Sequence, residues 1–334
     1  MNSEMLLEKS KRDFLEILKD LNNERQLESF KVFVKAAIHA KNLELKTSGS
    51  INSENKNKII KNKIDNIIQD LREAVPITAE APNENIFENY TSDTTIHVDS
   101  FLYDEDDVDR LCDEGKLPSA YCVQCKSRNT RQLTSVFLLH FIFETLLKGK
   151  TDDKVLLDIG SRLGGVLYLG YFYSHAKKII GIEMNPFFAN LQKEIISKYD
   201  MNDRVEVIQD DILNQAQLVH SSNIIIMRMY TPSYWCILIA LSIVDTLSIK
   251  DNVFQFFHAL PIQQRLWSFI RDNTAPSTLL ITIPSLEEQL ADASCKIDYK
   301  KWVKEMKLDV LPNELEMTEE NIEALQSIHL YQVK

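Results

Sequence analysis

The sequence predicts a doubly wound α/β domain with a mostly parallel sheet, preceded by a helical N-terminal module. Two observations predict this fold class. Five short apolar runs have the character of buried strands, and they are residues 154–158, 178–182, 204–209, 223–227 and 278–283. A glycine-rich turn over residues 160–165 joins the first of them to an apolar segment with helical spacing. A strand, a tight turn and a helix N-terminus present backbone N–H groups to a ligand at the end of a parallel sheet.

The N-terminal half contains segments with helical spacing of their apolar residues. Residues 5–46 predict two amphipathic helices, and residues 58–75 a further one. We therefore predict a helical region over residues 1–75, a linker with a cysteine-rich segment over 76–130, and the α/β domain over 131–334. The acidic run at residues 104–109 lacks the glycine and terminal glutamate of an EF-hand. It is better explained as the first turn of a helix, which the helix dipole favours.

The C-terminal part completes the predicted domain. We expect helices at residues 258–272, 302–306 and 319–326, a strand at 307–311, and a last strand at 327–334.

Composition indicates an intracellular globular protein. The N-terminus is charged within a few residues and has no signal-peptide core, and five cysteines, an odd number, suggest a reducing compartment. We therefore expect a cytoplasmic or nuclear protein that does not enter a membrane. The net charge of -11 disfavours broad contact with nucleic acid, because such binding depends on Lys and Arg neutralising phosphates.

The turn and the next strand carry the residues expected to bind a cofactor. Glu183 ends the second strand, about 20 residues after the turn, where an acid can accept hydrogen bonds from both ribose hydroxyls of a nucleoside. Arg162 takes the place of the glycine that lets backbone approach a pyrophosphate. Asp158 would also repel a pyrophosphate. A cofactor with a cationic sulfonium and an ammonium group fits this acidic site better.

Asp158, Gly160 and Gly164, together with Glu183, resemble motifs I and II of the class I S-adenosylmethionine-dependent methyltransferases. The resemblance covers about residues 130–334 and implies a Rossmann-like, mostly parallel seven-stranded sheet whose last strand is antiparallel. It implies that S-adenosyl-L-methionine is the cofactor and that Ser161 also belongs to its site. The Asp-Ile-Gly-Ser segment also resembles the non-SET histone-lysine methyltransferases, which carry glycine at the position of Arg162.

The strand at 204–209 ends on two further acids. In the family that the chain resembles, an acid here accepts from the adenine amino group and the next backbone N–H meets a ring nitrogen. Asp211 followed by Ile212 fits that pattern best, with Asp210 as the alternative. A carboxylate at this point can also serve as the N-cap of a helix that starts at Ile212.

The catalytic residues are expected after the strand at 223–227. Asp251 and Asn252, with the aromatic residues that follow, resemble the motif IV region of N-methyltransferases. Met227 joined directly to Asp251 would read as one strand and its catalytic turn, so we interpret residues 228–250 as an insertion. The alternative is that the strand continues into a helix and that Asn252 is an ordinary cap.

A second candidate site involves cysteines. Cys122 and Cys125 form a C-x-x-C pair with the spacing of tetrahedral metal ligands, and Cys112 can supply a third thiolate. His97 or His140 would complete a structural zinc knuckle. The alternative is a cluster of reduced, partly buried thiols.

The predicted activity is S-adenosylmethionine-dependent methyl transfer, with N-methylation of a protein acceptor favoured by the amide of Asn252. Two other interpretations stay open. One is a catalytically inactive, cofactor-binding scaffold, and the other is an NAD-dependent oxidoreductase.

Overall fold

The computed structural model describes residues 57–82, 98–117, 130–131, 135–228, 260–306 and 319–334. The chain divides into two units, Met1–Lys63 and Ile64–Lys334. Every contact described below lies within the second unit.

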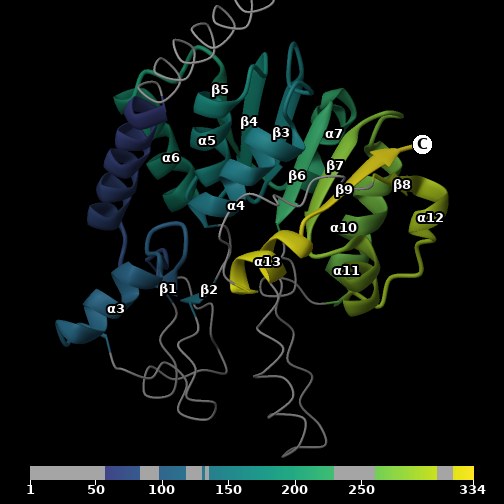
Figure 1. The fold of residues 1–334 in the computed structure, drawn as a ribbon. Helices are drawn as coiled ribbons and strands as arrows, with labels where there is room; N and C mark the ends of the chain where they lie inside the picture. The colour runs from purple at the N-terminus through teal and green to yellow at the C-terminus, as the bar shows by residue number, and fades with distance from the viewer. Residues whose placement is uncertain (1–56, 83–97, 118–129, 132–134, 229–259, 307–318) are drawn as a thin grey trace, which may run out of the picture. The chain divides into compact units, whose positions relative to one another are not determined.

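The second unit is built around a seven-stranded sheet with the strand order β5-β4-β3-β6-β7-β9-β8 (Figure 1). Its strands are β3 Val155–Ile159, β4 Lys178–Glu183, β5 Val205–Gln209, β6 Ile224–Arg228, β7 Leu279–Ile283, β8 Val303–Glu305 and β9 His329–Val333. The strands from β5 to β7 pair in parallel, whereas β9 pairs antiparallel with both β7 and β8. The predicted mostly parallel seven-stranded sheet with a reversed last strand is therefore confirmed.

Helices cover both faces of the sheet, as a doubly wound fold requires. Figure 1 shows one group on one face and a second group on the other. The first group is α4 Val136–Phe141, α5 Gly165–Tyr173 and α6 Pro186–Lys198, and the second is α7 Ala216–Ser221, α10 Leu260–Asn273 and α11 Leu286–Asp292.

Shorter elements complete the described part of the chain. They are β1 Val98–Asp99, α3 Glu105–Asp113, β2 Thr130–Arg131, η1 Ile142–Leu146, η2 Ile212–Asn214, α12 Tyr299–Trp302 and α13 Glu319–Gln326. β1 and β2 pair in parallel as a separate two-stranded sheet. The acidic run therefore forms the start of α3 as predicted, with the side chain of Asp104 accepting the N–H of Asp107.

Successive side chains of β3 point to opposite faces of the sheet, so they pack into two different cores. Leu157 and Ile159 belong to the apolar core that includes residues of α7, α10 and α11. Asp158 lies between them in sequence, so its side chain points to the opposite face, toward α5. The side chain of Asp158 is fully buried there.

The C-terminal part of the helix that ends at residue 74 belongs to this unit and makes polar contacts within it. Asp70 accepts hydrogen bonds from the hydroxyl of Tyr199 and the ammonium of Lys198, both at 2.7 Å. Arg72 pairs with Asp107 of α3 and donates to the carbonyl of Leu102.

The predicted helix at residues 302–306 is wrong. The helix α12 ends at Trp302, and residues 303–305 form the edge strand β8, in which Val303 pairs with Val333 of β9. The buried Trp302 donates from Nε1 to Thr274 Oγ1 at 3.0 Å. Pairing with β9, which lies 30 positions later in the chain, overrides the helical pattern of the local sequence. The strand predicted at 307–311 lies outside the described residues.

Candidate cofactor site

The glycine-rich turn after β3 is built from residues in an unusual backbone conformation. Gly160, Arg162 and Gly164 have φ angles of 75°, 41° and 82°, a region that L-amino acids with side chains rarely adopt. The N–H groups of Gly160 and Ser161 both donate to the carbonyl of Ile182, at 3.0 and 3.1 Å. These two bonds hold the turn against the carboxyl end of β4.

Gly164 is required by packing as well as by its backbone angle. It is the N-cap of α5, and a Cβ added at this position would lie 2.6 Å from the ring and hydroxyl of Tyr168. The Tyr168 side chain is fully buried one turn into the helix. The glycine that the sequence suggested for a cofactor thus has a structural role of its own.

Glu183 joins the turn to the next helix. Its Oε2 accepts the N–H of Arg162 at 2.8 Å, and its Oε1 accepts the N–H of Asn185, also at 2.8 Å. The side chain is half-buried, and each carboxylate oxygen has lone pairs for more than one hydrogen bond. The two N–H donors therefore set the carboxylate at a fixed angle at the carboxyl edge of the sheet, where open α/β sheets bind ligands.

Asp158 lies in register with Gly181 of β4 and with Ile226 of β6. A Cβ on Gly181 would come within 2.7 Å of Leu167 and 2.8 Å of Ser161 Oγ. The missing side chain therefore makes room for Ser161 and for close packing of α5. The Ser161 hydroxyl lies beneath the turn and finds no hydrogen-bond partner among the described residues.

The side chain of Arg162 is engaged by protein groups. Its guanidinium donates to the carbonyl of Ala79 at 2.7 Å and lies 4.4 Å from the ring centroid of the buried Phe188. Its carbonyl accepts from the amide of Gln192 at 2.6 Å. The sequence suggested that Arg162 would crowd a diphosphate. In the structure, the side chain instead attaches the segment around Ala79 to the turn.

The two acids after β5 have different surroundings. Asp211 is the N-cap of η2, and its Oδ1 accepts the N–H of Leu213 at 2.9 Å. Asp210 accepts from Asn214, from Gln215 and from the N–H of Asp211, and these three donors hold the pKa of its carboxyl below the usual range. The capping interpretation of Asp211 is confirmed, and its assignment to the adenine remains a prediction.

The structure adds residues that the sequence analysis did not identify. Asn185 caps α6, with its side chain accepting from Phe187 N, and Pro186 occupies the first helical position. Asn followed by Pro is a recognised helix start, so this signal was present in the sequence. No local pattern indicates the bond from Arg162 to Ala79, because the two residues are 83 positions apart.

Several predicted site residues lie outside the described part of the chain. They are Asp251, Asn252, His97, Cys122 and Cys125. Cys112 lies on α3 and is partly exposed. Among the described residues, no three His, Cys, Asp or Glu side chains are grouped as metal ligands. The zinc knuckle and the catalytic pair therefore remain predictions, as does the insertion, of which only Arg228, the last residue of β6, is described.

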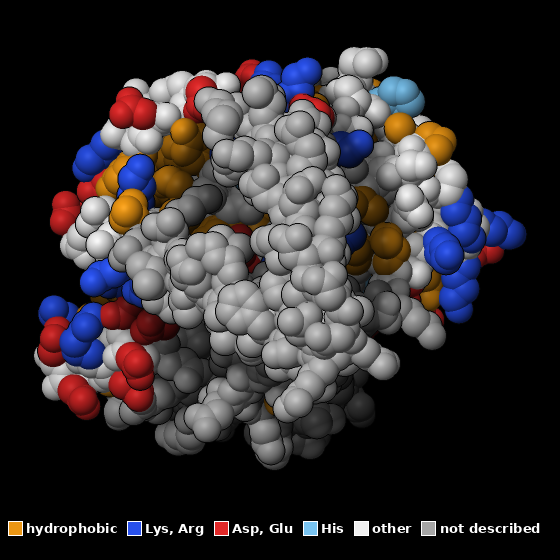
Figure 2. All heavy atoms as spheres, turned by 45° about the horizontal axis from the view of Figure 1, so that its top comes forward, with side chains coloured by type: hydrophobic (Ala, Val, Ile, Leu, Met, Phe, Trp, Pro, Cys, Tyr) orange, Lys and Arg blue, Asp and Glu red, His pale blue; other side chains and the backbone are white. Residues whose placement is uncertain are grey.

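The surface charge is mixed on the face that Figure 2 presents. Lys and Arg lie interspersed with Asp and Glu over its described part. No helix within the described ranges is long and apolar enough to cross a membrane.

The residues at the carboxyl edge suit a cationic nucleoside cofactor. A turn with left-handed residues brings backbone close to the end of the sheet, and a positioned carboxylate stands beside it. A carboxylate accepts from hydroxyl groups and attracts positive charge.

No protein-family model and no curated protein matches the sequence. Among solved structures, the chain is similar to an RNA methyltransferase from Salinibacter ruber in complex with S-adenosyl-L-homocysteine, at 13% identity and a TM-score of 0.31, covering 53% of this chain and 96% of that one. It is similar to an O-methyltransferase from Bacillus cereus in complex with the same compound, at 13% identity and a TM-score of 0.34, covering 69% and 90%. It is also similar to a putative O-methyltransferase from Klebsiella pneumoniae, at 12% identity and a TM-score of 0.35, covering 68% and 89%. Likenesses at this level assign neither an acceptor nor a site residue. By its own sheet topology, the chain has the Rossmann-like fold expected of a class I methyltransferase.

Proposed function

We propose that the chain is an S-adenosyl-L-methionine-dependent methyltransferase that N-methylates a protein acceptor. The observation that carries the proposal is the position of Glu183. Its carboxylate is held by the N–H groups of Arg162 and Asn185 at the carboxyl edge of the sheet. A carboxylate held by two backbone donors keeps further lone pairs with which it can accept from the hydroxyls of a ribose.

The engagement of Arg162 supports the cofactor-binding part of the proposal. The departure from glycine at this position raised the question of whether the turn can accept a cofactor. Its guanidinium lies between Ala79 and the ring of Phe188, so Arg162 is used to hold the turn. An NAD-dependent oxidoreductase is disfavoured by the acidic side chain of Asp158, since like charges repel the diphosphate of that cofactor.

The expected acceptor is an amine nitrogen. Methyl transfer is an in-line displacement, so the protein contributes mainly the alignment of the nucleophile. An amide oxygen at Asn252 would hold an amine with its lone pair on the methyl axis. A protein is preferred to nucleic acid as the acceptor because the chain carries a net charge of -11.

Calorimetry with S-adenosyl-L-homocysteine and with NAD tests the cofactor. We expect saturable binding of the first compound and none of the second, whereas the reverse result would establish the oxidoreductase interpretation. Methyl transfer from labelled S-adenosyl-L-methionine to a protein mixture and to total RNA, in parallel, then tests the acceptor. Label in protein supports the proposal. Label in RNA alone would contradict the acceptor, and cofactor binding without transfer to any acceptor would favour the scaffold.

The zinc knuckle is proposed for the same chain. We expect close to stoichiometric zinc in protein purified without chelator, and its loss when Cys122 and Cys125 are both replaced by Ser. A preparation free of zinc would contradict the knuckle without bearing on the methyltransferase site.

A further inference from the structure

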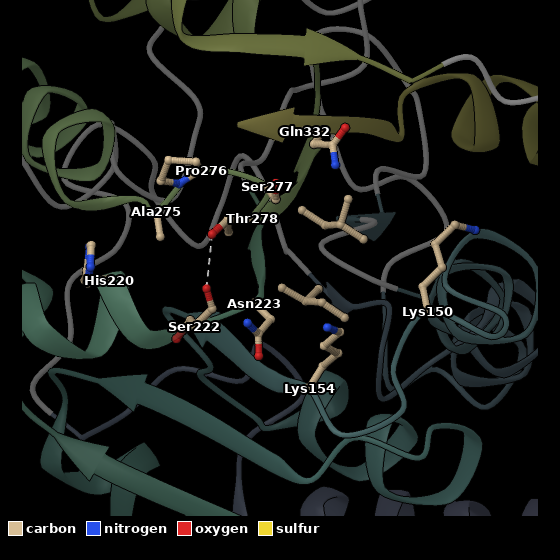
Figure 3. Close-up of a pocket in the computed structure, with 12 residues that line it drawn as sticks. Lys150, Lys154, His220, Ser222, Asn223, Ala275, Pro276, Ser277, Thr278 and Gln332 are labelled. Atoms are coloured by element: carbon tan, nitrogen blue, oxygen red, sulfur yellow. Dashed lines mark hydrogen bonds between the residues drawn. The ribbon is translucent and has the colours of Figure 1, made fainter. Parts of the chain in front are cut away.

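A hollow of about 370 Å³ opens at the amino edge of the sheet, at the opposite ends of the strands from the glycine-rich turn (Figure 3). Its lining comes from the beginnings of β6 and β7, the end of β9, and the loops that precede β3, β6 and β7. Neither the turn nor Glu183 contributes to it.

The floor of the hollow is a row of residues in register. Ile224 pairs with Leu279, and Leu279 pairs with Gln332 on the antiparallel strand β9. Paired residues on adjacent strands point to the same face of a sheet. Ala275 and Pro276 extend the apolar lining on one side, so the floor can accept an apolar group beside the Gln332 amide.

The rim is rich in hydrogen-bond donors. Asn223 Oδ1 accepts the N–H of Val155 at 3.0 Å, which directs the NH₂ of this exposed amide away from the backbone. The neighbouring Lys154 is exposed, and its ammonium forms no ion pair within the described ranges. Lys150 gives one bond to the carbonyl of Leu146 at 2.8 Å, and an ammonium has three donors. In Figure 3, Gln332 lies across from Asn223 and Lys154.

The lining has a charge opposite to that of the whole chain. Lys150 and Lys154 are its charged residues, His220 lines it as well, and none of the described residues that line it is Asp or Glu. Two carboxylates lie in the turn between the lysines. Asp152 of that turn is paired with His175 at 3.3 Å, and neither Asp152 nor Asp153 lines the hollow. A donor-rich hollow without carboxylates suits an oxyanion.

We propose that this hollow binds a small phosphate monoester. Lys154 and the Asn223 amide hold the phosphate, with Lys150 or His220 at the ends of the hollow, and the organic part lies over Ile224 and Leu279. The site is separate from the methyltransferase site, and its existence does not depend on the proposed function.

Calorimetric titration with phenyl phosphate, inorganic phosphate and phenol at constant ionic strength tests the proposal. We expect phenyl phosphate to bind more tightly than inorganic phosphate and phenol not to saturate. Lys154→Ala should weaken phenyl phosphate binding about tenfold, because a charge-assisted hydrogen bond is lost. Lys177→Ala is the matched control, since Lys177 is also exposed at the same edge but does not line the hollow. The dissociation constant of this variant should stay within about twofold of the wild type, because Lys177 does not line the hollow and salt screens exposed charges.

An equal loss of affinity for phenyl phosphate in the two lysine variants would show that general surface charge causes the effect, and it would overturn the proposal. Equal affinity for phenyl phosphate and inorganic phosphate would show that the phenyl group gains nothing from the apolar floor. That result would also overturn the proposal. A second measurement uses the unaltered chain. Phenyl phosphate should slow acetylation of Lys154, followed by mass spectrometry, and leave Lys177 unaffected. Acetylation of Lys154 at an unchanged rate would contradict the site, whatever the behaviour of the variants.

Discussion

The backbone N–H of Arg162 donates to Oε2 of Glu183 at 2.8 Å, which joins the turn after β3 to the end of β4. The same arginine uses its side chain to hold the carbonyl of Ala79. One residue thus connects the proposed ribose-binding acid to a segment 83 positions earlier in the chain. The stability of the turn and the position of Glu183 should therefore respond together when Arg162 is changed.

Replacing Arg162 separates its side-chain role from its backbone conformation. Both Arg162→Ala and Arg162→Gly remove the bond to Ala79 and the contact with Phe188, which should lower the free energy of unfolding by about 1–3 kcal/mol. Glycine also relieves the φ of 41°, so Arg162→Gly should be more stable than Arg162→Ala by about 0.5–1 kcal/mol. Urea denaturation measures both values. An alanine variant as stable as the glycine variant would show that the turn is not strained at this residue.

Tyr168 carries a hydroxyl that has no hydrogen-bond partner among the described residues, although the side chain is fully buried. An unsatisfied buried polar group is costly. Tyr168→Phe removes this hydroxyl and keeps the ring beside Gly164, so this variant should be as stable as the wild type or more stable by up to about 1 kcal/mol. Thermal unfolding tests this expectation. A clear loss of stability would indicate that the hydroxyl has a partner, such as a bound water.

The carboxyl of Asp70 should make stability depend on pH. Hydrogen bonds from Lys198 and then Tyr199, together with the charge of Lys198, lower the pKa of Asp70. A lowered pKa favours the folded state above the ordinary aspartate value, and this contribution is lost as the pH falls through the lowered value. Asp70→Asn should therefore cost up to about 1 kcal/mol at pH 7, and this cost should shrink as the pH falls through the lowered pKa of Asp70. Denaturation at several pH values, with the exposed Asp113→Asn as control, measures the difference. A cost that does not change with pH would exclude the ion pair as its cause.

The sequence was sufficient to predict the sheet but not all of its edges. The central strands are apolar runs whose burial on both faces leaves a continuous local signal, and the acid Glu183 follows from the end of one such run. Residues 303–305 became a strand only because Val303 meets Val333, a partner 30 positions away. Such a long-range pairing cannot be predicted from the local sequence pattern.

The site residues also divide into those that the local sequence predicted and those that it did not. The turn and Glu183 were predictable because they are adjacent to strands that the sequence defines. The use of the Arg162 side chain was not, since its partner Ala79 belongs to a distant segment. The motif offered only a functional explanation for Gly164. The structural reason for this glycine is its close contact with Tyr168, which the motif does not indicate.

The segment at residues 228–250 is predicted not to belong to the functional enzyme. Strand β6 ends at Arg228, and ligands bind outside strand ends of this kind, where Asp251 and Asn252 would supply the turn. If exposed, the apolar residues of the insertion would favour aggregation. A deletion of residues 228–250 should be more soluble and bind S-adenosyl-L-methionine at least as tightly. If the deletion unfolds a chain that otherwise binds cofactor, the segment is a native structural element.

The most direct test of the account is the affinity of Glu183 variants for S-adenosyl-L-homocysteine, measured by calorimetry. Glu183→Ala should weaken binding by about 1–3 kcal/mol, because hydrogen bonds to a charged acceptor are lost. Glu206→Ala is the control, since it removes a surface acid of β5 that pairs with Lys178, and its affinity should equal that of the wild type. Circular dichroism would establish that both variants are folded. A dissociation constant unchanged by Glu183→Ala would contradict the assignment of this acid to the cofactor.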